Sequence, residues 1–219
     1  MARESREIPL PVDGGVVVGD LAVPASARAV VVFAHGSGSS RHSARNRRVA
    51  EHLQEAGYAT LLMDLLTDKE EREDLVTRQW RFDIALLGTR LVNAVDHLAQ
   101  LGDTSGLPVA AFGASTGAAA ALDAAAMRPA RVRAVVSRGG RPDLATQDLS
   151  TVSSPTLLIV GGEDHVVIEF NEQAASHLRA DHELVIVRGA THLFEEPGAL
   201  DQVVQFSVDW LDRWIAPAG

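Results

Sequence analysis

The chain has 219 residues, of which 46% are hydrophobic and 22% are charged. These values are typical of a soluble globular protein with a full-sized core and argue against a disordered chain. The formal net charge of −9 argues against a broad surface for nucleic acid or anionic membranes. There are no cysteines, which excludes disulfides, thiolate metal sites and a cysteine nucleophile.

The N-terminal segment, residues 1–12, carries scattered charges and two prolines. It lacks the apolar core and the small-residue cleavage site of a signal peptide. No run of the chain approaches the roughly 18 apolar residues that a membrane span needs. We therefore expect a cytoplasmic protein with one domain over residues 1–219 and with neither a membrane nor a nucleic acid as partner.

Short β-branched runs alternate with longer helical patterns along the chain, which is typical of a parallel sheet with helices on both faces. Residues 8–12 and 16–23 flank a turn-like Asp-Gly-Gly and predict an antiparallel hairpin at the sheet edge. Further strands are predicted at 30–34, 60–63, 109–112, 132–136, 156–160 and 183–187. Helices are predicted at about 43–56, 81–101, 115–127, 168–178 and 201–214.

The highly charged stretch 68–74 is interpreted as solvated and is too short to form a large lid. The predicted fold is thus a three-layer α/β/α domain with a mostly parallel central sheet, an antiparallel N-terminal hairpin and no lid domain. The last helix has a broad apolar stripe, which could pack inward or partly at an interface. A monomer and a homodimer therefore both remain open.

A Gly-Ala-Ser-Thr-Gly motif at residues 113–117 follows a buried strand and leads at once into an Ala-rich helix. This is the G-x-S-x-G pattern in the strand–turn–helix context that it requires. The turn is so sharp that only glycines and other small residues give the strained Ser115 backbone enough room. Ser115 would lie at a helix N-terminus, where the Thr116 N–H can stabilise a developing oxyanion. The alternative, that Ser115 only caps the helix, is disfavoured by this context.

With these features the chain resembles the α/β-hydrolases and, among them, the small, lidless dienelactone-hydrolase-like group. The resemblance extends from the turn at His35 and Gly36 to the last helix. It implies an α/β-hydrolase fold and a nucleophile at position 115. Dienelactone hydrolases proper have a cysteine at this position, whereas this chain has Ser115.

A serine hydroxyl is a poor nucleophile until a base takes its proton, and the chain has eight histidines. His192 follows the predicted strand 183–187 through a short loop, at the end of a strand where open α/β sheets place their chemistry. The segment 189–194 resembles the histidine loop of the family and makes His192 the predicted base. His42 and His165 lie in loops near the predicted site and are weaker alternatives.

The resemblance places the acid of the triad in the loop after strand 156–160, where Asp164 matches best. The chain order is then serine, acid, histidine, as in this fold. We expect Asp164 to accept a hydrogen bond from His192 Nδ1–H and to fix its tautomer. Glu163 is the local alternative, and Asp64 fits the order badly because it precedes the serine.

The loop after strand 30–34 has the sequence His-Gly-Ser-Gly-Ser-Ser. In this fold the corresponding loop gives the second oxyanion N–H. The resemblance implies the Ser37 N–H, with Gly38 as the alternative, and a structural role for His35. A phosphate-binding loop is a competing interpretation, but no Gly-Lys-Ser/Thr follows.

Arginines cluster near the predicted site although the chain is acidic. Arg41 lies just after the glycine loop, and Arg138 and Arg141 follow strand 132–136. Together with Gly38 they are the candidate substrate-binding residues. One interpretation is a set of solvated loop charges. The other is a basic rim that attracts a carboxylate- or phosphate-bearing ester.

Together these features predict a serine hydrolase that cleaves small esters, lactones or thioesters through an acyl-serine intermediate. The chemistry requires no metal and no organic cofactor. Two alternatives remain open: a non-catalytic scaffold that binds a ligand or partner, and an acyltransferase that uses the same triad. The sequence does not identify the physiological substrate.

Overall fold

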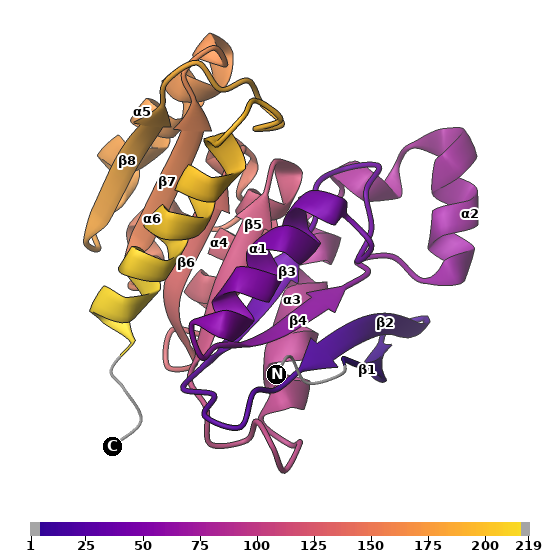
Figure 1. Ribbon diagram of the computed structural model, residues 1–219. Helices are drawn as coiled ribbons and strands as arrows, with labels where there is room; N and C mark the ends of the chain where they lie inside the picture. Colours follow the sequence, from indigo (N-terminus) through magenta and orange to yellow (C-terminus); the bar gives the residue numbers. More distant parts are fainter. Residues whose placement is uncertain (1–4, 216–219) are drawn as a thin grey trace.

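The computed structural model describes residues 5–215 and shows one eight-stranded sheet with helices on both faces (Figure 1). The strands are β1 (Arg6–Val12), β2 (Gly15–Ala22), β3 (Val30–Ala34), β4 (Ala59–Met63), β5 (Val109–Ala114), β6 (Val132–Arg138), β7 (Thr156–Gly161) and β8 (His182–Val187). The helices are α1 (Ala44–Glu55), α2 (Asp68–Thr77), α3 (Ile84–Leu98), α4 (Thr116–Met127), α5 (His165–His177) and α6 (Ala199–Trp214). Short 3-10 turns lie at Trp80–Phe82, Pro142–Leu144 and Leu149–Thr151.

The strand order is β1-β2-β4-β3-β5-β6-β7-β8. The six strands from β4 to β8 in this order pair in parallel, whereas β1 and β2 form an antiparallel hairpin that joins the sheet antiparallel to β4. The predicted three-layer fold with its N-terminal hairpin is therefore confirmed. Because the carboxyl ends of the parallel strands meet at one edge, the loops that follow them lie side by side.

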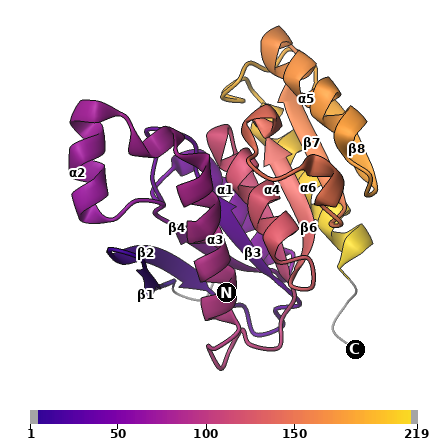
Figure 2. The same cartoon turned by 180° about the vertical axis from the view of Figure 1, so that it is seen from behind.

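The central strands β3 and β5 carry no polar side chain, because both of their faces are buried. In β3, Val30, Val32 and Ala34 belong to the core cluster under α3 and α4. The alternate residues Val31 and Phe33 belong to the cluster under α1 and α6. The views from the front and from behind show these two helix layers, with α5 on the side of α3 and α4 (Figures 1 and 2).

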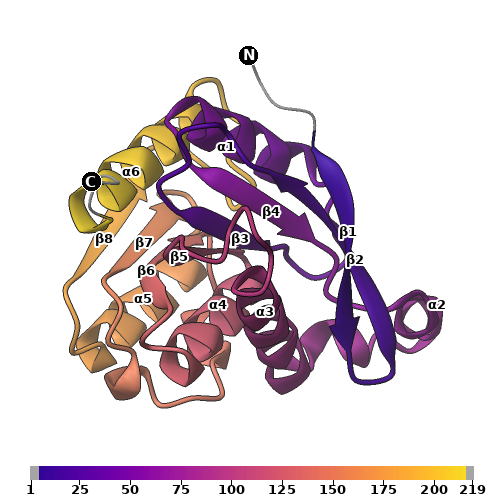
Figure 3. The ribbon, with the colours of Figure 1, turned by 90° about the horizontal axis from the view of Figure 1, so that it is seen from below.

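The predicted charged stretch 68–74 is not simply solvated, because it forms most of helix α2. Thr67 and Glu70 form a capping box at its N-terminus, which stabilises a helix start. Most of its side chains are exposed, but Asp74 is buried and pairs with Arg81. Burial acts to raise the pKa of Asp74, but hydrogen bonds from Arg81 and from the Trp80 N–H outweigh it and lower that pKa. Helix α2 lies at the periphery of the molecule, near the β1–β2 hairpin (Figure 3).

Apart from α2, which was not predicted as a helix, the predicted boundaries differ most at both ends of α3, which ends at Leu98 instead of position 101, and at the start of α5. Helix α3 begins at Ile84 instead of position 81, because the Asp83 side chain accepts a hydrogen bond from the Leu86 N–H and caps the helix there. Helix α5 begins at His165, three residues earlier than expected. Within residues 5–215, no helix is long and apolar enough to cross a membrane. A single domain over residues 1–219 stays a prediction, and residues 1–4 and 216–219 lie outside the described residues.

Candidate active site

The turn between β5 and α4 holds Ser115 in a strained backbone conformation, with φ 52° and ψ −123°. Few non-glycine residues adopt a positive φ, and such strain persists only where the surroundings enforce it. The enforcement is steric. A Cβ on Gly113 would lie 2.3 Å from the Ala118 Cα, and a Cβ on Gly117 would lie 2.3 Å from the Ala34 carbonyl oxygen. Only glycine at these two positions lets β5, the turn and the loop after β3 pack this closely.

Three side chains from separate loops meet at this turn. The Ser115 hydroxyl lies 3.2 Å from His192 Nε2, and His192 Nδ1 lies 2.6 Å from Asp164 Oδ2. With the proton on Nδ1 donated to Asp164, Nε2 is left to accept the serine proton. The structure therefore brings together the three residues that the sequence predicts for a nucleophile, a base and an acid.

Backbone contacts hold the histidine loop against the acid loop. The Glu163 N–H donates to the Ala190 carbonyl at 3.0 Å. A Cβ on Gly161 would lie 2.5 Å from the carbonyl oxygens of Ala190 and Thr191, so the two loops are in van der Waals contact. This packing fixes the distance between the carboxylate and the imidazole without help from the substrate.

Two of the alternative residues, Asp64 and His42, are engaged in contacts with arginines. Asp64 accepts hydrogen bonds from the Arg41 backbone and side chain, and His42 contacts Arg47. His35 Nδ1 lies 2.9 Å from the Gly36 carbonyl, and burial lowers the pKa of His35. His35 thus has the structural, hydrogen-bonded place in the loop that was expected, and its lowered pKa favours the neutral form.

The glycine loop after β3 differs from the prediction in one detail. The Ser37 N–H, expected to be the second oxyanion donor, donates to Thr116 Oγ1 at 2.9 Å. In this structure the N–H is therefore not open to a substrate oxygen. The alternative, Gly38, has a φ of 70° and lies beside Arg81, whose Nη1 would be 3.3 Å from a Cβ at that position. The Thr116 N–H is at the first position of α4, where backbone N–H groups have no partner within the helix.

A cavity of about 260 Å³ opens onto the Ser115 hydroxyl. It lies between the carboxyl end of β6, the start of α1 and the histidine loop. Its lining includes Ser115 and His192 together with Arg45, Asn46, Arg138 and Leu193. Of these, Arg45, Asn46 and Leu193 were not among the candidate site residues predicted from the sequence. Asn46 lies in the first turn of α1, a few residues after the glycine loop. This short distance along the chain was the one sequence feature that could have placed it near the site.

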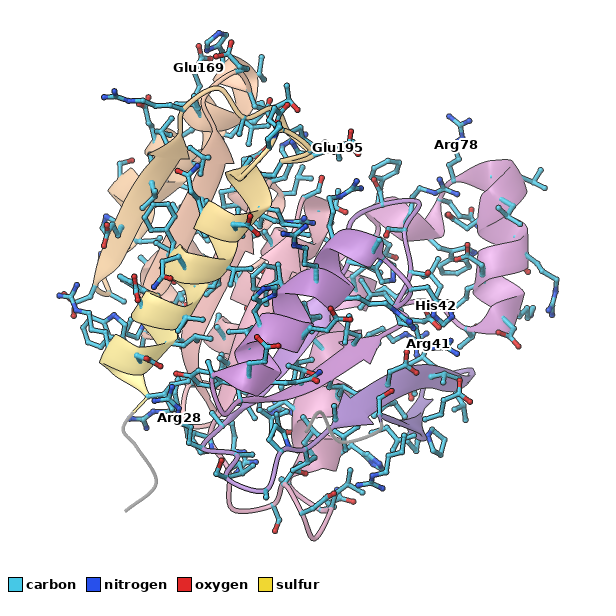
Figure 4. The ribbon with its side chains drawn as sticks, in the orientation of Figure 1. Arg28, Arg41, His42, Arg78, Glu169 and Glu195 are labelled. Atoms are coloured by element: carbon cyan, nitrogen blue, oxygen red, sulfur yellow. The ribbon has the colours of Figure 1, made fainter. Side chains whose placement is uncertain are left out.

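Two of the three predicted substrate-binding arginines are engaged elsewhere, which corrects the prediction. Arg41 forms ion pairs with Glu7, Asp20 and Asp64. In Figure 4 it lies on the side of β2, well apart from Glu195.

Arg141 makes two hydrogen bonds to Asp143 and stacks over the Phe170 ring. The prediction failed for Arg41 because its carboxylate partners come from other parts of the chain. It failed for Arg141 because its partner, Asp143, lies in the loop that follows it.

Arg138 is different, because none of the ion pairs within residues 5–215 includes it. The residue is 8% exposed, and its Nη2 donates to Asn46 Oδ1 at 3.2 Å. Its Nη1 is buried without a partner among the described residues. Burial, together with the nearby Arg45, lowers the pKa of Arg138 to about 10. A buried cation without an internal anion is costly, so this group is the one predicted arginine that remains available to a ligand.

Comparison with known families identifies the family to which the chain belongs. The model of the dienelactone hydrolase family matches residues 17–208. The chain belongs to the dienelactone hydrolase family. A crystal structure of a dienelactone hydrolase from Anabaena variabilis is similar to it, with a TM-score of 0.95 and 54% identity, covering 97% of this chain and 99% of that one.

More distant structures share the fold alone. Est1E from Butyrivibrio proteoclasticus is 17% identical, with a TM-score of 0.74 over 94% of this chain and 98% of its own. A dienelactone hydrolase-like promiscuous phosphotriesterase from metagenomic libraries is 18% identical, with a TM-score of 0.80 over 99% of this chain and 100% of its own.

A curated protein of Mycobacterium tuberculosis, provisionally named a phosphoribosyl transferase, is 59% identical over 202 residues. The match covers 92% of this chain but only 45% of that protein. The chain therefore spans less than half the length of this relative. Within residues 5–215, no group of three or more histidine and carboxylate side chains is placed to hold a metal ion.

Proposed function

We propose that this member of the dienelactone hydrolase family is a serine hydrolase that cleaves small carboxylic esters, lactones or thioesters. The observation that carries the proposal is the continuous chain of hydrogen bonds from Asp164 through His192 to Ser115. A triad in this arrangement makes the serine hydroxyl nucleophilic. The strained turn presents that hydroxyl at a helix N-terminus and beside a cavity.

In the first half of the reaction, Ser115 Oγ attacks the substrate carbonyl carbon while its proton passes to His192 Nε2. The resulting tetrahedral intermediate carries its negative charge on the former carbonyl oxygen, beside the N-terminus of α4. Collapse of this intermediate breaks the ester bond, and His192 gives the proton to the leaving alcohol or thiol. Asp164 stabilises the imidazolium throughout and keeps its own charge.

In the second half, water takes the place of the leaving group. His192 removes a proton from the water, whose oxygen attacks the acyl carbon. Collapse of the second intermediate returns the proton to Ser115 Oγ and releases the acid. An acyltransferase would follow the same steps with an alcohol or amine in place of water. The cavity of about 260 Å³ favours small acyl groups over long lipids.

Two observations favour a hydrolase over a non-catalytic scaffold. All three triad side chains are present and in hydrogen-bond contact, whereas a scaffold has no need of them. Related folds include esterases such as the one from Pyrococcus furiosus. The transferase name of the mycobacterial relative belongs to a protein of more than twice this length, and the triad offers no specific support for phosphoribosyl transfer.

The experiment is a panel of p-nitrophenyl esters, a lactone and a thioester, assayed with the wild-type protein and with Ser115→Ala. We expect hydrolysis by the wild type that disappears in the variant. Added acceptor alcohols distinguish hydrolysis from acyl transfer, because a transferase would form new esters at the expense of the free acid. Hydrolysis that survives in Ser115→Ala would show a different nucleophile.

We also propose that the preferred substrate carries an anionic group that reaches Arg138. The support is the buried guanidinium without a carboxylate partner, on the wall of the same cavity as Ser115. Arg45 adds a second cation there, although its Nη1 contacts Glu195 at 2.8 Å. Matched neutral and anionic esters, compared at low and high ionic strength, test this idea. An equal rate for both esters at low salt would refute it, because charge attraction is strongest there.

A further inference from the structure

The glycine loop contacts the nucleophile, but its expected oxyanion donor is already engaged. A Cβ on Gly36 would lie 3.1 Å from the Ser115 Cβ and 3.8 Å from its Oγ. The next residue, Ser37, donates its N–H to Thr116 Oγ1 at 2.9 Å. The threonine hydroxyl thus occupies the direction in which the N–H would otherwise point at a substrate oxygen.

The hydrogen-bond count of the Thr116 hydroxyl leaves one donor free. A hydroxyl has one proton to give and two lone pairs to receive, and the Ser37 N–H uses one lone pair. Among residues 5–215, no second hydrogen bond of this hydroxyl is formed. A helical threonine commonly donates to the carbonyl four residues earlier, but that residue is Phe112, which lies in β5 before the sharp turn.

The side chain is also shielded from bulk water, which would otherwise accept the free proton. Thr116 is 5% exposed. It faces a small hollow that is lined by the glycine loop, by Leu65, Leu66 and Leu87, and by the charged residues Glu71, Asp74 and Arg81. None of these charged side chains forms a hydrogen bond with the Thr116 hydroxyl among the described residues. A buried donor without an acceptor is costly, whereas a donor on the residue that follows the nucleophile is useful if negative charge develops within its reach.

We infer that the Thr116 hydroxyl is itself an oxyanion donor of this enzyme. In the tetrahedral intermediate, the oxyanion accepts one hydrogen bond from the Thr116 N–H and one from the Thr116 Oγ–H. The Ser37 N–H acts indirectly: by donating to the same hydroxyl oxygen it polarises the O–H bond and holds the rotamer. No covalent bond forms or breaks at Thr116. This inference rests on the proposed hydrolase function and adds a side-chain donor to it.

The test compares Thr116→Val with Thr116→Ser on a neutral p-nitrophenyl ester. Valine has nearly the same shape but no hydroxyl, and serine keeps the hydroxyl. We expect kcat to fall roughly 100-fold in Thr116→Val, the loss typical of a single oxyanion donor, with KM changed less than about threefold. Thr116→Ser should retain kcat within about fivefold of the wild type.

The opposite result has a clear meaning. Valine cannot accept the Ser37 N–H, so the substitution would free that group for the oxyanion. If Ser37 N–H is the true donor, Thr116→Val will be as active as the wild type or more active. Either that result, or a Thr116→Ser variant as inactive as Thr116→Val, overturns the inference.

A second readout separates catalysis from folding. A boronic acid forms a tetrahedral adduct with an activated serine and resembles the charged intermediate. Its inhibition constant should rise in Thr116→Val by about the same factor by which kcat falls, with the melting temperature little changed. An unchanged inhibition constant overturns the inference even if the rate is lower. If the wild type neither hydrolyses esters nor binds the boronic acid, the proposed function itself fails and this inference falls with it.

Discussion

Two arginines at the same edge of the sheet have opposite surroundings. Arg41 is in contact with three carboxylates, those of Glu7, Asp20 and Asp64. Arg138 has no carboxylate within hydrogen-bond distance among the described residues and gives one hydrogen bond to Asn46. The sequence gives the two residues the same signal, a cation shortly after a buried strand. The difference shows that the role of such an arginine depends on its tertiary partners. Where the fold places carboxylates around it, the arginine stabilises the structure, and where the fold places none, the arginine is available to bind a ligand.

The same contrast extends to the regions around the two arginines. Around Arg41 the polar groups pair with one another. Around Arg138 lie a strained serine, an imidazole in contact with it and a cavity. Functional sites commonly contain strained backbone and polar groups without hydrogen-bond partners, and the stability of the rest of the fold compensates for their energetic cost. We therefore expect substitutions of Ser115 and Arg138 to change activity and substitutions in the Arg41 cluster to change stability.

The largest effect is expected for Ser115→Ala, which removes the nucleophile. If the triad acts as a unit, kcat should fall by a factor on the order of 10⁶. Ser39→Ala is the matched control, because Ser39 lines the same cavity but is outside the triad, and its kcat should stay within a few-fold. Steady-state kinetics on one ester measures both. A comparable loss in the two variants would contradict a specific role for Ser115.

A change at the elbow should affect stability as well as activity. In Gly117→Ala the new Cβ would be placed 2.3 Å from the Ala34 carbonyl oxygen, so backbone must shift, and we expect a loss of about 3 kcal/mol in the free energy of unfolding. Gly106→Ala is the control, since nothing lies within 4 Å of its Cβ position and its effect should be about 0.5 kcal/mol or less. Urea denaturation measures both, and equal losses would show that the elbow is not sterically constrained.

Arg41→Met tests the structural side of the comparison. The substitution leaves three carboxylates close together without their cation. The Arg41 side chain that it replaces is only 16% exposed, so water screens this repulsion only in part. We expect the free energy of unfolding to fall by about 2 kcal/mol, with kcat on a neutral ester unchanged. A stable variant with impaired turnover of anionic esters would instead place Arg41 in substrate binding, as the sequence first indicated.

Arg138→Met tests the functional side. We expect kcat/KM for an anionic ester to fall about tenfold to 100-fold, and that for the matched neutral ester to change less than about threefold, because only the charged substrate loses a partner. The melting temperature should stay the same or rise, since the variant no longer buries an unpaired charge. Thermal unfolding and the two ester assays measure these effects. Equal losses on both esters would show that Arg138 has a general structural role.

The smallest effect is expected at Asp74, which belongs to a second paired cluster, with Arg81. Its pKa is lowered in the folded state, so the ionised carboxylate contributes stability above the unfolded-state pKa, and this contribution is lost as the pH falls through the folded pKa. Asp74→Asn should cost about 1 kcal/mol at pH 7, and less as the pH falls below about 4. Urea denaturation across that range measures the difference, and a cost independent of pH would contradict the assignment.

Much of the fold could be predicted because its signals are local. The apolar runs of the central strands reflect burial on both faces, and the small residues around Ser115 reflect a turn that admits no others. Asp164 and His192 were found by resemblance and by their position at strand ends. Each of these signals is carried by residues within a single loop or strand.

What could not be predicted depends on partners distant in the chain. The Ser37 N–H and the Thr116 hydroxyl that receives it are 79 positions apart, so no local pattern reveals that the N–H is engaged. Arg41 is neutralised in part by residues of the N-terminal hairpin. Asp74 is buried within a helix that otherwise has exposed charges. In each case a tertiary contact, absent from the local sequence, decides the role.

The central claim is that Asp164 and His192 make the hydroxyl of Ser115 reactive. Incubation with a fluorophosphonate, followed by mass spectrometry of the intact protein and of its peptides, tests this claim without knowledge of the substrate. We predict one covalent adduct per chain, on the peptide that contains residue 115, and no adduct in Ser115→Ala. An unmodified wild-type protein, or an adduct that persists in the variant, would contradict it.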